Sequence, residues 1–347
     1  MKIEMQMDLQ AEVPATLERV LDPAWVGAAL GKAVARVESV EVLRTVATKV
    51  RFAVEFADGS RGAYCLKGLL DVDEMTSRGG PTMVREADFY GKVAAHVDVR
   101  VPTCVTSVID RERQHAVVIM RDLIADGARF CTALEPFTAD EAAASLELLA
   151  RLHAGRGLLA GSPWIDRRVD QLAEARYVSA EQLQQMLDGP RGEGLPAITR
   201  DAGRLIAAIR ALAARDAARP QFLVHGDCHA GNIFRTGDGH GLIDWQLLQS
   251  GGWALDVAYH IAAVLPVELA EREERNLLGH YLVTMQALGC EMPCADEAWR
   301  QYRESAIYGF YLWAITRRVD APIIVAFVQR LGASVTRHAS HALLGIA

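Results

Sequence analysis

The sequence predicts an α+β fold in which a small antiparallel sheet precedes a larger, mainly helical part. Polar and apolar residues alternate over 49–56, as they do in a half-buried strand. Asp58 and Gly59 then give a turn signal, and a second strand is expected over 62–66. These segments predict an antiparallel hairpin, whereas the apolar residues beyond residue 122 mostly follow helical spacing.

The other predicted elements follow from the same periodicities and from the turn residues between them. Thr138 and Glu141 have the spacing of a capping box, which marks the start of a helix. The glycines of 237–239 indicate a turn between two short strands. The expected strands are 40–43, 99–108, 116–120, 232–234 and 241–244, and the expected helices are 82–97, 138–155, 178–187, 200–218 and several from residue 256 onward.

The change of pattern near residue 122 predicts two parts, 1–122 and 123–347. A chain of 347 residues is long enough for two medium-sized domains. A cleft between two such parts is a common place for a ligand, so we expect both parts to contribute functional residues.

Composition narrows the class of protein. Hydrophobic residues make up 51% of the chain and charged residues 23%, so it is expected to fold around a core. A net charge of −7 argues against a general nucleic-acid binder. No apolar run approaches the ~18 residues of a membrane span, and the first residues lack the apolar segment of a secretory signal. Six cysteines without a CxxC pair indicate reduced thiols, so we expect a cytoplasmic protein.

One set of polar residues has the inventory that phosphoryl transfer needs. Asp227 and Asn232 lie five residues apart, and Asp244 follows twelve residues later. One carboxylate orients the attacking hydroxyl, while an amide oxygen and a second carboxylate suit magnesium. Lys67 on a strand and Glu86 on the next helix fit a lysine that meets phosphates and the glutamate that fixes it. The Asp-to-Asn spacing equals that of the protein-kinase loop HRDxxxxN.

The residues around Asp227, Asn232 and Asp244 form motifs that point to one family of enzymes. VHGDCHAGNIF together with LIDWQ resembles the aminoglycoside phosphotransferase and choline kinase superfamily, whose loop reads HGDxHxxN and whose magnesium motif reads IDW or IDF. LARLHA resembles the LxxLHA helix of that superfamily, and Asp256 in GGWALDVAYH resembles its GxxxxDLA segment. IDWQ, RDL and DVAYH are most similar to the ecdysteroid-kinase-like bacterial phosphotransferases. The resemblance extends over residues 40–320.

The resemblance implies a protein-kinase-like bilobal fold and an enzyme that uses ATP and Mg²⁺ to phosphorylate a small hydroxylated molecule. It implies a nucleotide-binding lobe over 1–122 and a helical lobe with the catalytic loop and the acceptor site over 123–347. Asp227 would be the catalytic base, and Asn232 and Asp244 would bind magnesium and, through it, the nucleotide.

The same resemblance assigns the nucleotide contacts. Lys67 would meet the α- and β-phosphates, with Glu86 fixing Lys67. The backbone of 118–123, which includes Met120, would meet adenine. His225 and His229 would support the catalytic loop.

The sequence departs from the family at the turn between the first two strands, because 44–49 contains no glycine. Close backbone approach to phosphates favours glycine, so Thr48 or Lys49 is a candidate nucleotide contact instead. Glu74 is an alternative partner for Lys67, but it is expected in a loop and Glu86 on a helix, which favours Glu86.

Several alternative functions stay open at this point. The missing glycine motivates a kinase-fold nucleotide-binding protein without turnover, whereas the complete set of Lys67, Asp227, Asn232 and Asp244 argues against it. An aminoglycoside-type antibiotic kinase would need a carboxylate-rich acceptor wall, whereas the last helices carry Tyr308, Tyr311, Trp313, Arg317 and Arg318. This composition favours a neutral or hydrophobic alcohol. A protein kinase is disfavoured because no APE-like segment follows Asp244. A zinc site at His225 and His229 and a thiol nucleophile at Cys228 are also disfavoured.

Overall fold

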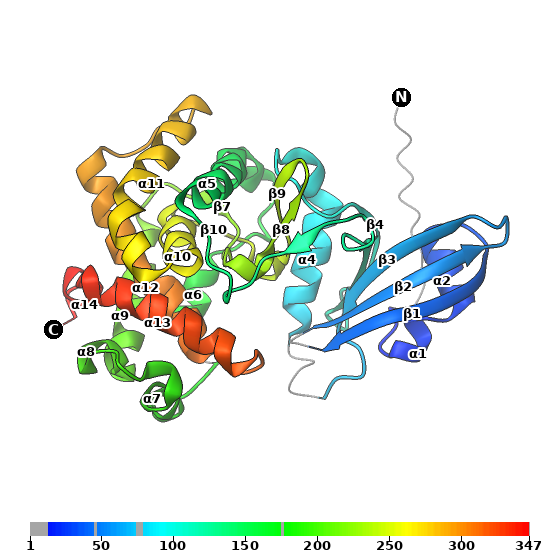
Figure 1. Ribbon diagram of the computed structural model, residues 1–347, viewed down its shortest axis with the longest axis horizontal. Helices are drawn as coiled ribbons and strands as arrows, with labels where there is room; N and C mark the ends of the chain where they lie inside the picture. Colours follow the sequence, from blue (N-terminus) through cyan, green and yellow to red (C-terminus); the bar gives the residue numbers. More distant parts are fainter. Residues whose placement is uncertain (1–12, 45–46, 74–78, 175–176, 347) are drawn as a thin grey trace. The chain divides into compact units, whose positions relative to one another are not determined.

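The computed structural model describes residues 13–44, 47–73, 79–174 and 177–346, which form a mixed helix and sheet fold, as predicted. The described residues divide into two compact units (Figure 1). The first contains the described residues up to Ala95 together with Pro102–Ala128. The second contains His96–Val101 and the described residues from Arg129 onward.

The first unit is built on a five-stranded sheet of order β1-β2-β3-β5-β4, in which all neighbouring strands are antiparallel. The predicted hairpin is its centre, formed by β2 and β3. The strands are β1 (Val34–Arg44), β2 (Thr48–Phe56), β3 (Arg61–Gly68), β4 (Cys104–Asp110) and β5 (His115–Arg121). The helices are α1 (Leu17–Val20), α2 (Pro23–Leu30) and α4 (Gly80–Lys92), and a 3-10 helix η1 (Ala94–His96) follows at the boundary of the unit.

Helices cover both faces of this sheet. Val50 and Phe52 of β2 and Leu66 of β3 are fully buried and share a hydrophobic cluster with Trp25 of α2. Successive side chains of a strand point to opposite faces, so Lys67 points away from that cluster. Lys67 meets α4 there, and α4 also packs against β4 and β5.

The strand predicted over 99–108 is too long, because β4 begins only at Cys104. Pro102 has no N–H to donate to a ladder, so it interrupts the extended pattern. The carbonyl of Arg100 instead accepts a hydrogen bond from the Leu242 amide (2.9 Å) in the second unit, to which Arg100 belongs.

The second unit is mainly helical, with two small sheets. Helix α5 begins with the predicted capping box, since Thr138 and Glu141 each bond the other's backbone amide. The helices are α5 (Ala139–Ala154), α6 (Arg168–Ala173), α7 (Ala180–Asp188), α8 (Ala197–Arg200), α9 (Ala202–Ala217), α10 (Ala254–Val264), α11 (Val267–Ala287), α12 (Ala295–Ile315), α13 (Ala321–Arg337) and α14 (Ser340–Leu343). The 3-10 helices are η2 (Gly155–Gly161), η3 (Pro190–Gly192), η4 (Ala230–Asn232) and η5 (Trp245–Leu247). In the described part of the chain, none of the helices is long and apolar enough to cross a membrane.

The strands of the second unit differ in detail from those predicted. The strands expected at 232–234 and 241–244 are β8 (Ile233–Thr236) and β9 (Gly239–Leu242), which form a sheet with β6 (Arg129–Phe130). A ribbon of β7 (Phe222–Val224) and β10 (Gln249–Gly251) was not expected. Three-residue strands are too short to show a periodicity.

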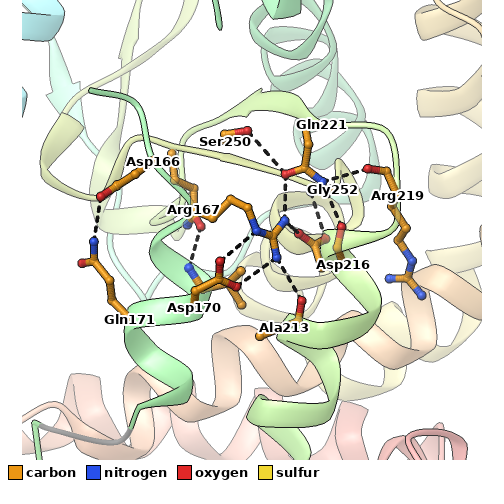
Figure 2. Close-up of polar contacts among 12 residues, drawn as sticks. Asp166, Arg167, Asp170, Gln171, Ala213, Asp216, Arg219, Gln221, Ser250 and Gly252 are labelled. Atoms are coloured by element: carbon orange, nitrogen blue, oxygen red, sulfur yellow. Dashed lines mark hydrogen bonds and ion pairs between the residues drawn. The ribbon is translucent and has the colours of Figure 1, made fainter. Parts of the chain in front are cut away.

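A partly buried polar network anchors one end of this ribbon (Figure 2). Arg167, just before α6, donates to Asp216 of α9 (2.8 Å) and to Gln221 (2.8 Å). The other oxygen of Asp216 accepts the Gly252 amide next to β10 (2.9 Å). Asp216 is buried, so these bonds satisfy a carboxylate that would otherwise be costly to place there. β7 runs from this anchor directly to His225.

Helix α10 lies in the core of the second unit, and every one of its residues is buried. It packs against α5, α11, α12 and α13. A helix that is apolar on all sides is expected in such a position. Three polar residues, Asp256, Tyr259 and His260, nevertheless lie on it at i, i+3 and i+4, which places them on one face.

Candidate active site

The loop 225–232 leaves β7 and is held through its backbone by Asp256. The His225 amide donates to Oδ2 of Asp256 (2.8 Å) and the Gly226 amide to Oδ1 (2.9 Å). Gly226 has φ +81°, and a Cβ there would lie 2.3 Å from the Leu247 carbonyl oxygen. Glycine is therefore required here by conformation and by space.

The rest of that α10 face also supports the loop. The Cys228 carbonyl can only accept, so Nδ1 of His260 carries a proton and donates to it (2.7 Å). From α12, the Tyr308 hydroxyl donates to the Gly226 carbonyl (2.7 Å). Buried backbone groups need such partners, and here they come from core helices.

Asp256 is fully buried and in contact with His153 Nε2 (3.1 Å). Burial by itself raises the pKa of Asp256, but the hydrogen bond from His153, the charges of His153 and His225 and the Gly226 amide together hold this pKa below its ordinary value. The carboxylate is thus kept ionised at the point where it accepts the loop amides.

Both carboxylate oxygens of Asp227 accept a hydrogen bond. Oδ1 accepts from the Tyr259 hydroxyl (3.0 Å) and Oδ2 from Nδ2 of Asn232 (3.1 Å). Nδ2 of Asn232 also donates to the Asp227 carbonyl (2.8 Å), so both amide protons are used within the loop. Only the amide oxygen of Asn232 then remains to coordinate a cation.

Asp227 keeps 24% of its side chain exposed, although its surroundings are buried. Burial, followed by the charge of Asp244, raises the pKa of Asp227 to about 6, against the opposing effects of His225, Tyr259 and Asn232. A carboxylate with a raised pKa at a partly exposed loop is the usual condition of a general base.

Asp244 lies two residues beyond the end of β9, not at the strand end as predicted. Its backbone is left-handed, with φ +67°. The preceding residue is fixed on both sides: the Ile243 amide donates to the Asn232 carbonyl (3.0 Å), and Nε2 of His225 lies 3.0 Å from the Ile243 carbonyl. His225 therefore supports the loop, as expected. His229 does so too, since its Nδ1 accepts the Gly231 amide (3.0 Å).

In the first unit, the structure brings Lys67 of β3 and Glu86 of α4 together. The ammonium and the carboxylate lie 2.7 Å apart, with side chains only 4% and 1% exposed. A buried pair of this kind holds each charge in one place. The alternative partner Glu74 lies outside the described residues.

Met120 lies in β5, buried, with its backbone opposite Cys65 of β3. The segment after it is fixed by Asp122, whose Oδ1 accepts the Ile124 amide (3.0 Å) and whose Oδ2 accepts from Arg51 (3.0 Å). Thr48 begins β2 and is buried, and Lys49 lies opposite Lys67. Thr45 and Val46 of the turn without glycine lie outside the described residues.

Other candidates turn out to be structural. Cys228 is fully buried, burial raises the pKa of its thiol far above the ordinary value, and it donates to the Asp256 carbonyl. Within the described ranges, no group of three or more His, Cys, Asp and Glu side chains forms a metal site. Tyr308, Tyr311 and Trp313 lie on α12 and are buried, whereas Arg317 and Arg318 follow the end of that helix, contrary to the prediction.

The sequence interpretation missed Tyr259 and His260 as contributors to this site. The available signal was polar residues spaced i, i+3 and i+4 with Asp256 in an otherwise apolar helix, since buried polar groups need partners.

Comparison with known proteins gives the family of the chain. A model of the phosphotransferase enzyme family (APH) matches residues 75–303, well over half of the chain. The chain belongs to this phosphotransferase enzyme family. The predicted resemblance to the aminoglycoside phosphotransferase and choline kinase superfamily is confirmed, and the finer placement near ecdysteroid-kinase-like enzymes stays a prediction. No curated protein matches the chain.

Two solved structures with TM-scores of 0.50 or more show the fold of the chain. A Ralstonia eutropha JMP134 protein provisionally assigned as an aminoglycoside phosphotransferase is 13% identical, with TM-score 0.52 over 92% of this chain and 97% of that one. A choline kinase from Cryptosporidium parvum Iowa II is 10% identical, with TM-score 0.50 over 88% of each chain. Spectinomycin phosphotransferase APH(9)-Ia, solved with ADP and spectinomycin, is 10% identical, with TM-score 0.49 over 94% of this chain and 98% of that one. The predicted protein-kinase-like α+β fold is confirmed.

Proposed function

We propose that the chain transfers the γ-phosphoryl group of ATP, with Mg²⁺, to a hydroxyl of a small molecule. The observation that carries this proposal is the carboxylate of Asp227, which is partly exposed and held at both oxygens by Tyr259 and Asn232. Phosphoryl transfer depends mainly on positioning and electrostatics, so a fixed carboxylate is the group that the reaction needs.

The residues present fit a magnesium ion. Asn232 has only its amide oxygen left, and Asp244 is a carboxylate whose charge acts on Asp227. Mg²⁺ prefers oxygen ligands and is commonly held by one or two side chains together with phosphates. Asn232 and Asp244 would supply those two ligands. A cation there would also offset the repulsion between the two aspartates.

The residues of the first unit fit a nucleotide. We propose that the ammonium of Lys67, fixed by Glu86, meets the α- and β-phosphates, and that the backbone around Met120 meets adenine. Residues 1–122 would then be the nucleotide-binding lobe and 123–347 the lobe with the catalytic loop and the acceptor site. ATP supplies the transferred phosphoryl group when it is bound.

Asp227 would orient the acceptor hydroxyl and accept its proton. The aromatic residues Tyr308, Tyr311 and Trp313 of α12 are buried, so the choice between a neutral alcohol and an aminoglycoside as acceptor is left to the screen below. The six cysteines are unpaired, which fits a reducing compartment, and we propose a cytoplasmic location.

A screen of hydroxylated metabolites and antibiotics tests this function. We expect magnesium-dependent ADP release that rises with one class of alcohol, together with a product heavier by one phosphoryl group in mass spectrometry. Asp227→Ala is the control and should abolish both signals while the fold stays intact. If MgATP raises the melting temperature but no alcohol is phosphorylated, the chain is a nucleotide-binding protein without turnover. The absence of glycine from 44–49 makes this the second candidate.

A further inference from the structure

Two hydrogen bonds in series lead from the core of the second unit to Asp227. Nε1 of Trp313, on α12, lies 2.5 Å from the Tyr259 hydroxyl, and this hydroxyl, on α10, lies 3.0 Å from Oδ1 of Asp227. Tyr259 is fully buried and Trp313 is 5% exposed. The contacts are therefore shielded from competing water.

The direction of both bonds is fixed by chemistry. An indole N–H can only donate, so the oxygen of Tyr259 accepts from Trp313. An ionised carboxylate can only accept, so the hydroxyl proton of Tyr259 is directed to Asp227. Because Trp313 donates to the Tyr259 oxygen, the hydroxyl proton of Tyr259 cannot point toward Trp313 and points to Asp227 instead.

These bonds define the plane of the carboxylate. Tyr259 holds Oδ1 and Asn232 holds Oδ2, so rotation of the Asp227 carboxylate would break both contacts. Each oxygen has a second lone-pair position, so one of them can still accept the acceptor hydroxyl. The hydrogen bonds from Tyr259 and Asn232 thus restrict the orientation of the Asp227 carboxylate and leave room for the acceptor hydroxyl.

Aromatic packing keeps the donors in place. The ring of Trp313 lies 4.2 Å from that of Phe327 on α13 and 5.1 Å from that of His229, centroid to centroid. Phe327 is 1% exposed. Movement of the indole would open a cavity in this cluster, which is costly in a close-packed core.

We propose that Tyr259 and Trp313 are positioning residues for phosphoryl transfer, in which Trp313 orients the hydroxyl of Tyr259 and Tyr259 orients the carboxylate of Asp227. This inference rests on the proposed function. Neither residue is assigned a contact with the acceptor or the nucleotide. Their effect should thus fall on the rate of transfer and leave nucleotide affinity unchanged.

Tyr259→Phe tests the second bond, because it removes the hydroxyl and keeps the ring. With MgATP and water as acceptor, we expect kcat for ADP release to fall about tenfold to a hundredfold, the scale expected for a misplaced catalytic group, while KM for ATP changes less than about twofold. Tyr302→Phe is the matched control. Tyr302 is also fully buried, lies on α12 and donates to a carboxylate, that of Glu274 (3.3 Å), outside the catalytic loop. The control should keep wild-type kcat.

Trp313→Phe tests the first bond. It should lower kcat less than Tyr259→Phe does, and the double variant should be no slower than Tyr259→Phe alone. This non-additivity is specific to residues that act in series, because two independent structural defects would multiply their effects.

The indole ¹H–¹⁵N signals give a readout independent of turnover. The chain has six tryptophans, and the signal missing in Trp313→Phe identifies that of Trp313. The Trp313 signal should move upfield in Tyr259→Phe and keep its position in Tyr302→Phe. If it does not move in Tyr259→Phe, the hydrogen bond from Trp313 to Tyr259 is absent and the proposal is overturned. If it moves but kcat in Tyr259→Phe equals that of wild type, the positioning role is wrong and the proposed function stands. If wild type releases no ADP from MgATP with water or any screened alcohol, the proposed function fails, and the inference with it.

Discussion

Two residues near the candidate catalytic Asp227 have a left-handed backbone. Gly226 precedes Asp227 directly, and Asp244 acts on its charge. Neither conformation follows from the periodicities that predict strands and helices. The family motifs HGD and IDW pointed to both residues, but only the structure shows their left-handed conformations. At Gly226 it is the close approach of the Leu247 carbonyl.

Gly226→Ala should destabilise the protein and abolish turnover. Alanine in a left-handed conformation costs about 1–2 kcal/mol, and the clash with Leu247 adds to it, so we expect a loss of more than about 2 kcal/mol in urea unfolding. Gly194→Ala is the matched control, because Gly194 has the same φ of +81° but open space around it. It should cost only about 1–2 kcal/mol, the cost of the left-handed backbone, and keep turnover. Equal losses for both variants would show that the Leu247 contact is unimportant.

Asp244→Asn should raise the magnesium concentration needed for half-maximal ADP release and lower kcat. Asparagine tolerates the left-handed backbone, so the free energy of unfolding should stay within about 1 kcal/mol of wild type. A magnesium titration at saturating ATP measures the effect. Unchanged magnesium dependence would remove Asp244 from the proposed metal site.

At the scale of elements, α10 explains how the loop 225–232 keeps its shape. One face of this buried helix supplies Asp256 to two loop amides, Tyr259 to Asp227 and His260 to the Cys228 carbonyl. The sequence predicted the central hairpin because the alternation over residues 49–56 is a strong signal. It did not predict the ribbon of β7 and β10, because three-residue strands owe their pairing to tertiary contacts such as Asp216 with Gly252.

The buried histidine of α10 should make stability depend on pH. Burial lowers the pKa of His260 from 6.5 to about 4, so between these values the unfolded chain binds more protons than the folded one. His260 contributes its full stabilisation above pH 6.5 and loses it as the pH falls toward 4, by about 3 kcal/mol. Urea unfolding of wild type and His260→Gln across this range measures it.

The stability advantage of wild type over His260→Gln should shrink as the pH falls. His280→Gln, at a partly exposed position with 40% of the side chain accessible, is the control for replacing an imidazole by an amide. A constant difference between wild type and His260→Gln from pH 7 to pH 4 would contradict the account of His260.

At the scale of the molecule, the fold class could be predicted from the sequence, because a sheet-rich beginning and a helical remainder differ in periodicity. The strand predicted over 99–108 begins too early, although Pro102 was a sequence signal against it, and the contact of Arg100 with Leu242 appears only in the folded chain. Tyr259 and Trp313, which support Asp227, lie 32 and 86 positions after it in the sequence. No local sequence pattern indicates contacts between residues so far apart.

Removal of magnesium should abolish turnover and leave the fold unchanged. In the described part of the chain, no group of three or more His, Cys, Asp and Glu side chains is placed to hold a metal ion, and we propose that nucleotide phosphates complete the magnesium site of Asn232 and Asp244. EDTA should leave the melting temperature of the protein unchanged, whereas MgATP should raise it more than ATP or Mg²⁺ alone. A large fall in the melting temperature with EDTA would indicate a structural metal instead.

The central claim is that Asp227 is the catalytic base of a phosphotransferase, and Asp227→Asn tests it most directly. Asparagine keeps the shape of the side chain and removes its charge and its basicity. The decisive measurement is single-turnover transfer of ³²P from [γ-³²P]ATP to an alcohol identified in the screen, at saturating Mg²⁺. We predict that Asp227→Asn binds MgATP with wild-type affinity and transfers phosphate at least about a hundredfold more slowly. Transfer at the wild-type rate would contradict the assignment of Asp227 as the base.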